Sequence, residues 1–300
     1  MKAAARPRAA YLPAVALAFL ALVWGYNWVV MKVAVQYADP FVFSALRNFL
    51  GGLALFAIVA LRGGPFRPPL PLWLLTVFAI LQTSMSGVTI WALQLGSAGK
   101  TSILTYTMPF WILFIAWPVL GERIRGVQWA AVILALGGLV FVLEPWGLRG
   151  LAAGLLALWG GICWAIASVL LKVIRRRYQV EILSLTAWHT LIGSIPLVVA
   201  AFFTADRWPV WNGTLVAAIV YNVIVASAVA GLLWLYVLSS MPAGVAGISS
   251  LAIPVVGVLS AWIQLGERPS TAEAVGTGLI VAALAVMTAR GLRAARQTGP

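Results

Sequence analysis

Long apolar segments recur along the whole chain and restrict its fold more than any other feature of the sequence. A helix needs about 20 mostly apolar residues to cross the hydrocarbon core of a bilayer. Ten such segments follow one another, with only short polar gaps between them. They are Tyr11–Val35, Phe41–Leu61, Leu72–Leu95, Thr101–Leu120, Val127–Leu143, Leu151–Lys172, Ile182–Thr204, Gly213–Leu238, Ala243–Leu265 and Ala272–Ala289. The sequence therefore predicts an all-α membrane protein with ten transmembrane helices.

The amino-acid composition also indicates that these segments lie in a lipid bilayer. The 300 residues are 63% hydrophobic and 9% charged, whereas soluble domains carry about 25% charged residues. The net charge of +13 would indicate nucleic-acid binding in a soluble protein. Here the basic residues lie in the gaps between apolar segments, so we expect the bilayer, and not nucleic acid, as the partner.

The distribution of basic residues predicts the orientation. With the N-terminus inside, the cytoplasmic side holds fourteen of the 20 basic residues, the opposite side holds five, and Arg47 lies within a span. This asymmetry satisfies the positive-inside rule, and an even number of spans places both termini in the cytoplasm. The first apolar segment with its preceding bases resembles a signal peptide, but it is long enough to span, so we interpret it as an uncleaved helix of a multi-pass protein of the bacterial inner membrane.

Two halves of the chain repeat the same features. Trp24 and Lys32 are eight residues apart, as are Trp164 and Lys172. Pro109 precedes Gly121-Glu122-Arg123 by twelve residues, and Pro254 precedes Gly266-Glu267-Arg268 by the same twelve. Five spans per half is an odd number, so the second half must enter the membrane from the opposite side. This predicts two inverted-topology five-helix repeats, residues 1–148 and 149–300, the architecture of many secondary transporters. Duplication of a scaffold without that function is the alternative.

With these motifs and the opening Trp24-Gly25-x-Asn27-Trp28, the chain resembles the ten-helix, EamA-type branch of the drug/metabolite transporter superfamily. Within that branch it is most similar to exporters of aromatic and other amino acids. The resemblance implies export of small metabolites from the cytoplasm by alternating access, through a central cavity between the halves. It implies amino acids as substrates, with organic cations or drugs and nucleotide-related metabolites as alternatives.

Polar and aromatic residues inside the spans are the candidates for lining that cavity. Trp24, Asn27, Trp28 and Met31 share one helical face. The full set of candidates is Trp24, Asn27, Trp28, Gln82, Ser86, Tyr106, Trp164, Ser168, Tyr221 and Asn222. Ser249, Ser250 and Trp159 are further candidates. Serines can equally bind neighbouring helices, whereas amides have four hydrogen-bonding groups that packing alone rarely satisfies. The rings could hold an apolar side chain or a cation, or simply pack.

Arg47 and His189 are the ionisable side chains that we place within spans, at approximately corresponding positions of the two halves. Each could extend along its helix to the near interface or act in gating, and His189 could carry a proton. No carboxylate lies mid-span, so we expect facilitated movement driven by the substrate gradient, or coupling through a group that the sequence does not identify.

Pro109 lies within the fourth span and Pro254 within the ninth. Because proline has no N–H, each leaves the carbonyl four residues earlier, that of Thr105 and that of Ser250 respectively, without its helical hydrogen bond. We predict hinges there. The fifth and tenth spans carry Gly137, Gly138, Gly276 and Gly278 and are interpreted as scaffold or as the interface of a homo-oligomer.

Other functional classes find little support. One histidine and the single Cys163 give no catalytic or metal-binding constellation, so we expect no enzyme activity, no metal and no cofactor. A channel or a non-transporting assembly protein is the remaining alternative, but nothing indicates the rings of charges or carbonyls of a pore.

Overall fold

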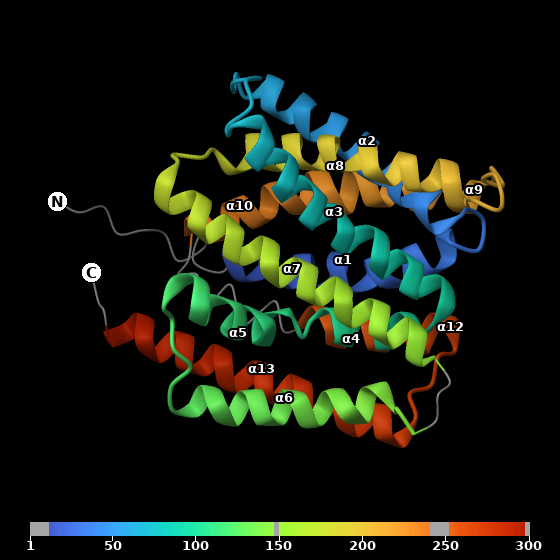
Figure 1. The fold of residues 1–300 in the computed structure, drawn as a ribbon. Coiled ribbons are helices and arrows are strands. Elements are labelled where there is room, and N and C mark those ends of the chain that lie inside the picture. Colours follow the sequence, from blue (N-terminus) through green and yellow to red (C-terminus); the bar gives the residue numbers. More distant parts are fainter. Residues whose placement is uncertain (1–11, 147–149, 241–251, 298–300) are drawn as a thin grey trace.

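The computed structural model describes residues 12–146, 150–240 and 252–297, and the regular structure in these ranges is helical. The first half holds α1 (Leu12–Ala34), α2 (Pro40–Leu61), α3 (Leu72–Leu95), α4 (Ala98–Thr105), α5 (Met108–Leu120) and α6 (Val127–Leu143). The second half holds α7 (Leu151–Arg177), α8 (Ile182–Thr204), α9 (Gly213–Val220), the π-helical η2 (Tyr221–Val229), α10 (Ala230–Ser240), α12 (Ala252–Leu265) and α13 (Thr271–Gln297). Together they form a helical bundle (Figure 1).

Each predicted apolar segment is mostly helical within the described residues. Eight segments are long and apolar enough to cross a membrane, and α6 and α12 are shorter apolar helices. The start of the predicted ninth span, including Ser249 and Ser250, lies outside the described residues. The fourth span differs from an unbroken helix, because Tyr106 and Thr107 separate α4 from α5. Pro109 at the start of α5 has no N–H to donate, which explains the break.

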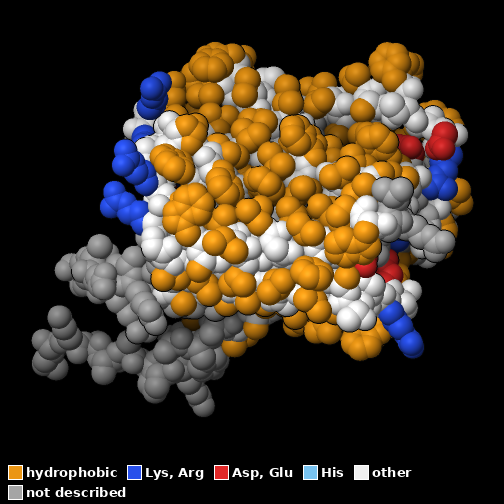
Figure 2. All heavy atoms as spheres, turned by 60° about the horizontal axis from the view of Figure 1, so that its bottom comes forward, with side chains coloured by type: hydrophobic (Ala, Val, Ile, Leu, Met, Phe, Trp, Pro, Cys, Tyr) orange, Lys and Arg blue, Asp and Glu red, His pale blue; other side chains and the backbone are white. Residues whose placement is uncertain are grey.

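The outer surface has the chemistry of a membrane protein. In the view of Figure 2, apolar side chains cover the broad middle of the molecule, and basic and acidic side chains gather toward the two ends. Many large apolar side chains are exposed, which is unfavourable in water. Phe202 is 84% exposed and Trp208 is 87% exposed. The chain is a multi-pass membrane protein.

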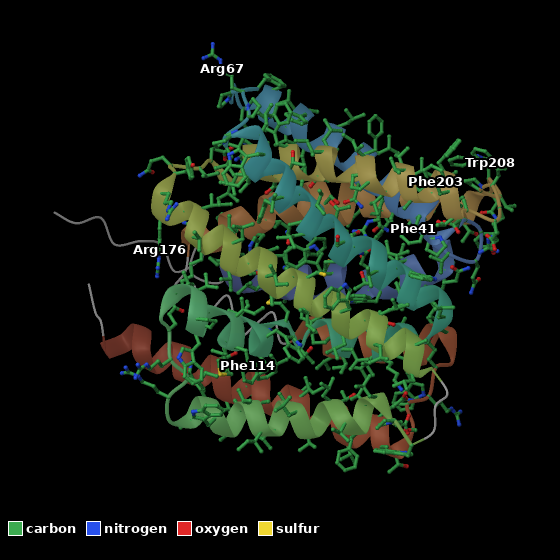
Figure 3. The ribbon with its side chains drawn as sticks, viewed as in Figure 1. Phe41, Arg67, Phe114, Arg176, Phe203 and Trp208 are labelled. Atoms are coloured by element: carbon green, nitrogen blue, oxygen red, sulfur yellow. The ribbon has the colours of Figure 1, made fainter. Side chains whose placement is uncertain are left out.

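The two ends of the bundle differ in charge as the sequence predicts. The described start of α1 and the end of α13 lie at the same end, on the left in Figure 1. Arg67 and Arg176 lie at that end, and Phe203 and Trp208 lie at the other (Figure 3). This arrangement agrees with the positive-inside pattern if the left end faces the cytoplasm.

The helix packing repeats with a shift of five segments. Helix α2 packs on α8, its counterpart, and α6 packs on α13. Helix α1 packs on α12, just as α7 packs on α4 and α5. Helix α3 packs on α7 and α8, just as the α9–η2–α10 segment packs on α1 and α2. Equivalent helices of the two halves therefore pack in equivalent pairs.

Candidate functional site

A cavity of about 620 Å³ lies inside the bundle. Helix α1 contributes Trp24, Asn27, Trp28 and Met31 to its wall, so the predicted face of this helix does line a cavity. The remaining described lining residues are Arg47, Asn48, Met85, Ser86, Thr89, Tyr106, Met108, Pro109, Trp164, Trp234, Ile253 and Leu284. They come from both halves of the chain, and most lie near the middle of their helices.

Aromatic rings form a connected part of the wall. The Trp28 and Tyr106 rings meet edge to face with centroids 6.4 Å apart, and Tyr106 meets Trp164 in the same way at 5.6 Å. Trp24 contacts Trp234 at 5.8 Å, and its indole N–H donates to the Ala226 carbonyl at 3.0 Å. These contacts hold the rings in fixed orientations around the cavity, with apolar faces available to a ligand.

Polar groups occupy another part of the wall, on α1, α2 and α3. Asn48 Nδ2 donates to the Ser44 carbonyl at 2.8 Å and to Ser86 Oγ at 3.3 Å. Asn27 is buried at 7% exposure, and its Oδ1 has no hydrogen-bond partner among the described residues. An unpaired buried acceptor is costly, and it marks a position where a ligand could donate a hydrogen bond.

Four of the predicted residues are not among the described residues that line this cavity. Gln82 and Ser168 share faces with the lining residues Ser86 and Trp164, and each lies four residues away along its helix. The Ser168 hydroxyl donates to its own helix, at the Trp164 carbonyl.

Tyr221 and Asn222 are the other two. The Tyr221 hydroxyl donates to the Val23 carbonyl at 2.8 Å, and its ring lies against Tyr26 on another face of α1. Asn222 is fully buried and donates to the Ala218 carbonyl. Both lie in η2, and a π-helix has more residues per turn than an α-helix. In this span Trp234 of α10 is the described residue that lines the cavity.

Arg47 and Asn48 of α2 are lining residues that the predicted set lacks. The sequence carried a signal for Arg47, because a charge inside a span needs a reason. Its side chain lies in the cavity wall, where it contacts Met31 near the end of α1. His189 is different: its ring packs edge to face on Phe78 at 5.2 Å, outside the described lining of the cavity. Trp159 is 52% exposed and is not among the described residues that line the cavity.

The predicted hinges lie where the helices are irregular or close to the cavity. Pro109 lines the cavity directly after the α4–α5 break. Pro109 has no N–H that could donate to the carbonyl of Thr105. Gly161 of α7 lies close to this carbonyl, because a Cβ added at Gly161 would lie 2.9 Å from its oxygen. Pro254 is buried in the first turn of the described α12, and Ser250 lies outside the described residues.

The two Gly-Glu-Arg turns have the same local structure at opposite ends of the bundle. Gly121 and Gly266 both adopt left-handed backbone conformations, with φ of 71° and 68°. The N–H of Glu122 donates to Ala116, and the N–H of Glu267 donates to Ala261, each at 3.3 Å. Both bonds span seven residues across the end of a helix, and the left-handed glycine inside each is typical of a helix C-terminus. Helix α5 ends on the left in Figure 1 and α12 on the right.

Each turn contacts the other half of the chain. At one end Lys172 Nζ lies 2.7 Å from Glu122 Oε2, and Arg176 lies 3.6 Å from Glu122. At the other end Glu267 accepts from the N–H groups of Ala98 and Gly99, at 2.7 and 3.2 Å. Lys32, the counterpart of Lys172, donates to the carbonyls of Leu93 and Gly96.

Comparison with known proteins gives the family. Residues 12–144 and 151–289 each match the EamA-like transporter family. The uncharacterized transporter YoaV of Bacillus subtilis is 30% identical, with 82% of this chain and 86% of that protein aligned. A probable amino-acid metabolite efflux pump of Escherichia coli is 27% identical, with 88% and 90% aligned. A solved crystal structure shares the fold, with a TM-score of 0.65 and 22% identity, over 93% of this chain and 98% of the other.

The match to the family covers both halves, and the helical bundle encloses a cavity between them. This chain belongs to the EamA-like transporter family.

Proposed function

We propose that this protein is a secondary transporter that exports amino acids, including aromatic ones, from the cytoplasm across the bacterial inner membrane. The observation that carries the proposal is the cavity of about 620 Å³ with its aromatic and polar walls. This volume lies within the range of small-molecule sites, about 300–1,000 Å³. Relatives in Escherichia coli and Salmonella typhimurium named as probable amino-acid metabolite efflux pumps support the substrate class.

Two inverted repeats, residues 1–148 and 149–300, are the proposed basis of alternating access. The packing shared by the two halves and the equivalent turns at opposite ends support this assignment. Two similar halves in opposite orientation can give inward-open and outward-open states of comparable free energy. The contacts of Glu122 join the halves at one end, and those of Glu267 join them at the other. Alternating access requires these two sets of contacts to break one after the other.

Counterflow into liposomes tests the function. Liposomes containing the purified protein and unlabelled phenylalanine should take up labelled phenylalanine in a saturable way, and other amino acids should compete. Trp164→Ala, in the cavity wall, should reduce this flux. Trp159→Ala on the same helix, 52% exposed outside the cavity, is the matched control and should not. Absence of flux for every amino acid tested, in protein that remains folded, contradicts the proposal.

The driving force should be the substrate gradient. All seven side-chain carboxylates of the chain lie in the described ranges, and none lines the cavity. The cavity therefore offers no carboxylate to exchange a proton during transport. Flux measured with and without a pH gradient should be similar, and strong accumulation driven by the pH gradient would show this part of the proposal to be wrong.

Pro109 is the proposed hinge of the first half, and Pro254 that of the second. Pro109→Ala should restore a hydrogen-bond donor at the α4–α5 break and reduce its freedom to bend. We expect slower counterflow with normal insertion and yield. Pro118→Ala, inside α5 but away from the break, serves as the comparison. Wild-type rates in both Pro109→Ala and Pro254→Ala contradict the hinge.

A further inference from the structure

Arg47 is the one charged residue among the described residues that line the cavity. It is the eighth residue of α2 (Pro40–Leu61), about 11 Å along the helix from its start at a rise of 1.5 Å per residue. Its Nη1 lies 3.0 Å from Met31 Sδ on α1. The guanidinium is thus held at the α1–α2 wall of the cavity, within the apolar part of the bundle.

No carboxylate neutralises this charge. The four ion pairs among the described residues involve Lys100, Lys172 and Arg176 with Glu122, Glu144 and Glu273. Asp39 directly precedes α2, and its carboxylate accepts hydrogen bonds from the Phe41 and Val42 N–H groups at the start of that helix. Because an arginine stays protonated in proteins, the cavity carries a positive charge whose hydrogen-bond partner among the described residues is a thioether, a weak acceptor.

An unpaired charge at this depth is costly, so it is typically matched by a partner or serves a function. A guanidinium presents several N–H donors in one plane, and these fit both oxygens of a carboxylate. The aromatic wall of Trp28, Tyr106 and Trp164 lies in the same cavity. Asn27, one helical turn from Met31, offers the unpaired Oδ1 described above.

We propose that Arg47 binds the carboxylate of the transported molecule, with the aromatic rings holding its apolar side chain. The inference rests on the proposed function and names its substrate class: small carboxylates with an apolar body, including α-amino acids. Asn27 Oδ1 accepts a hydrogen bond from the ammonium group when one is present. Arg47 repels organic cations that lack a carboxylate, although the rings alone would accept them by cation–π attraction. Arg47 is thus a specificity-determining residue.

Competition experiments on the wild-type protein test this selectivity directly. Counterflow of labelled phenylalanine should be inhibited by 3-phenylpropionate, which keeps the carboxylate and lacks the ammonium group. Phenylalaninamide and phenethylamine, which keep the ring and lack the carboxylate, should inhibit at least about tenfold more weakly, the loss expected for one charged hydrogen-bonding partner. Equal inhibition by the amide and the acid overturns the assignment.

Variants of Arg47 identify the responsible side chain. Arg47→Gln should weaken the apparent affinity for phenylalanine by about tenfold to a hundredfold and abolish the preference for the acid over the amide. Arg47→Lys keeps the charge without the planar donors, so it should recover part of both. His189→Gln, in the corresponding span but outside the described cavity wall, is the matched control and should keep wild-type selectivity. Unchanged selectivity in folded Arg47→Gln overturns the proposal.

Binding of 3-phenylpropionate, followed by tryptophan fluorescence of the detergent-solubilised protein, separates this inference from the function itself. Binding that depends on Arg47 without any amino-acid flux would support the carboxylate site and reject the transport proposal. Phenylalanine flux with no preference for carboxylates would support the transport proposal and reject the carboxylate site. No binding to the wild-type protein, measured up to millimolar ligand, would reject the carboxylate site.

Discussion

Glu267 connects the two halves at the end of the bundle opposite to Arg67 and Arg176. Its carboxylate accepts from two N–H groups at the start of α4, the unpaired donors of a helix N-terminus. Burial raises the pKa of Glu267, whereas the Gly99 and Ala98 N–H groups and the charge of Lys32 lower it. Burial has the largest effect, so the native pKa lies above the ordinary value.

Two substitutions of Glu267 separate its hydrogen bonds from its charge. Glu267→Ala should lower the free energy of unfolding by about 1 kcal/mol, the usual cost of losing a helix cap. Glu267→Gln keeps an acceptor and avoids the burial of a charge, so at neutral pH its effect should be smaller. Melting temperatures of the detergent-solubilised proteins measure both, and a larger loss in Glu267→Gln than in Glu267→Ala contradicts this reasoning.

The pH dependence of this difference has a definite sign. Because the native pKa of Glu267 is raised, the folded protein takes up this proton more readily than the unfolded chain, whose pKa is about 4.3. The group's contribution to stability therefore grows as pH falls through its native pKa and is lost as pH rises through it. The advantage of wild type over the non-titrating Glu267→Gln should increase from pH 7 toward about pH 4. A stability advantage of wild type that decreases as the pH falls would contradict this prediction.

At the scale of whole elements, α6 and α13 pack through glycines. A Cβ added at Gly138 would lie 2.7 Å from the Gly276 carbonyl, and one at Gly276 would lie 2.6 Å from the Gly138 carbonyl. The backbones of the two helices thus approach closely, which in lipid favours association through packing. Gly137 and Gly278 have nothing within 4 Å of an added Cβ, so they are the glycines left for a proposed interface between protomers.

Adjacent glycines of α6 therefore give a matched pair of variants. Gly138→Ala should separate α6 from α13 and lower stability by about 1–3 kcal/mol, as overpacking does in tightly packed cores. Gly137→Ala adds the same methyl group into open space and should be neutral or slightly stabilising, because alanine favours helices. Thermal unfolding in detergent measures both. Equal effects of the two changes would show that the close approach is unimportant.

Across the whole molecule, the proposed topology rests on the two Gly-Glu-Arg turns. Arg123 and Arg268 are both exposed and follow equivalent turns at opposite ends of the bundle. An inverted repeat in the membrane requires that these two residues face opposite compartments. The basic Arg67 and Arg176 lie at the left end (Figure 3), which the positive-inside rule assigns to the cytoplasm.

Single-cysteine labelling tests this topology. In a background with the buried Cys163 changed to Ser, Arg268→Cys should react with an impermeant thiol reagent added to intact cells. Arg123→Cys should react only after the membrane is permeabilised. The unsubstituted background controls for other reactions. Labelling of both cysteines from the same side would exclude inverted repeats and, with them, the proposed mechanism of alternating access.

The sequence by itself determined the helical segments, the family and the cavity-facing side of α1. The helical segments and the side of α1 follow from apolar length and helical periodicity, which are local properties of a chain in lipid, whereas the family follows from the resemblance of the repeated motifs. Only the tertiary structure decided that Arg47 and Asn48 line the cavity and that Tyr221 and Asn222 do not. The reason is physical: the face of a helix that meets the cavity depends on the helices packed around it, and residue spacing along one span does not contain that information.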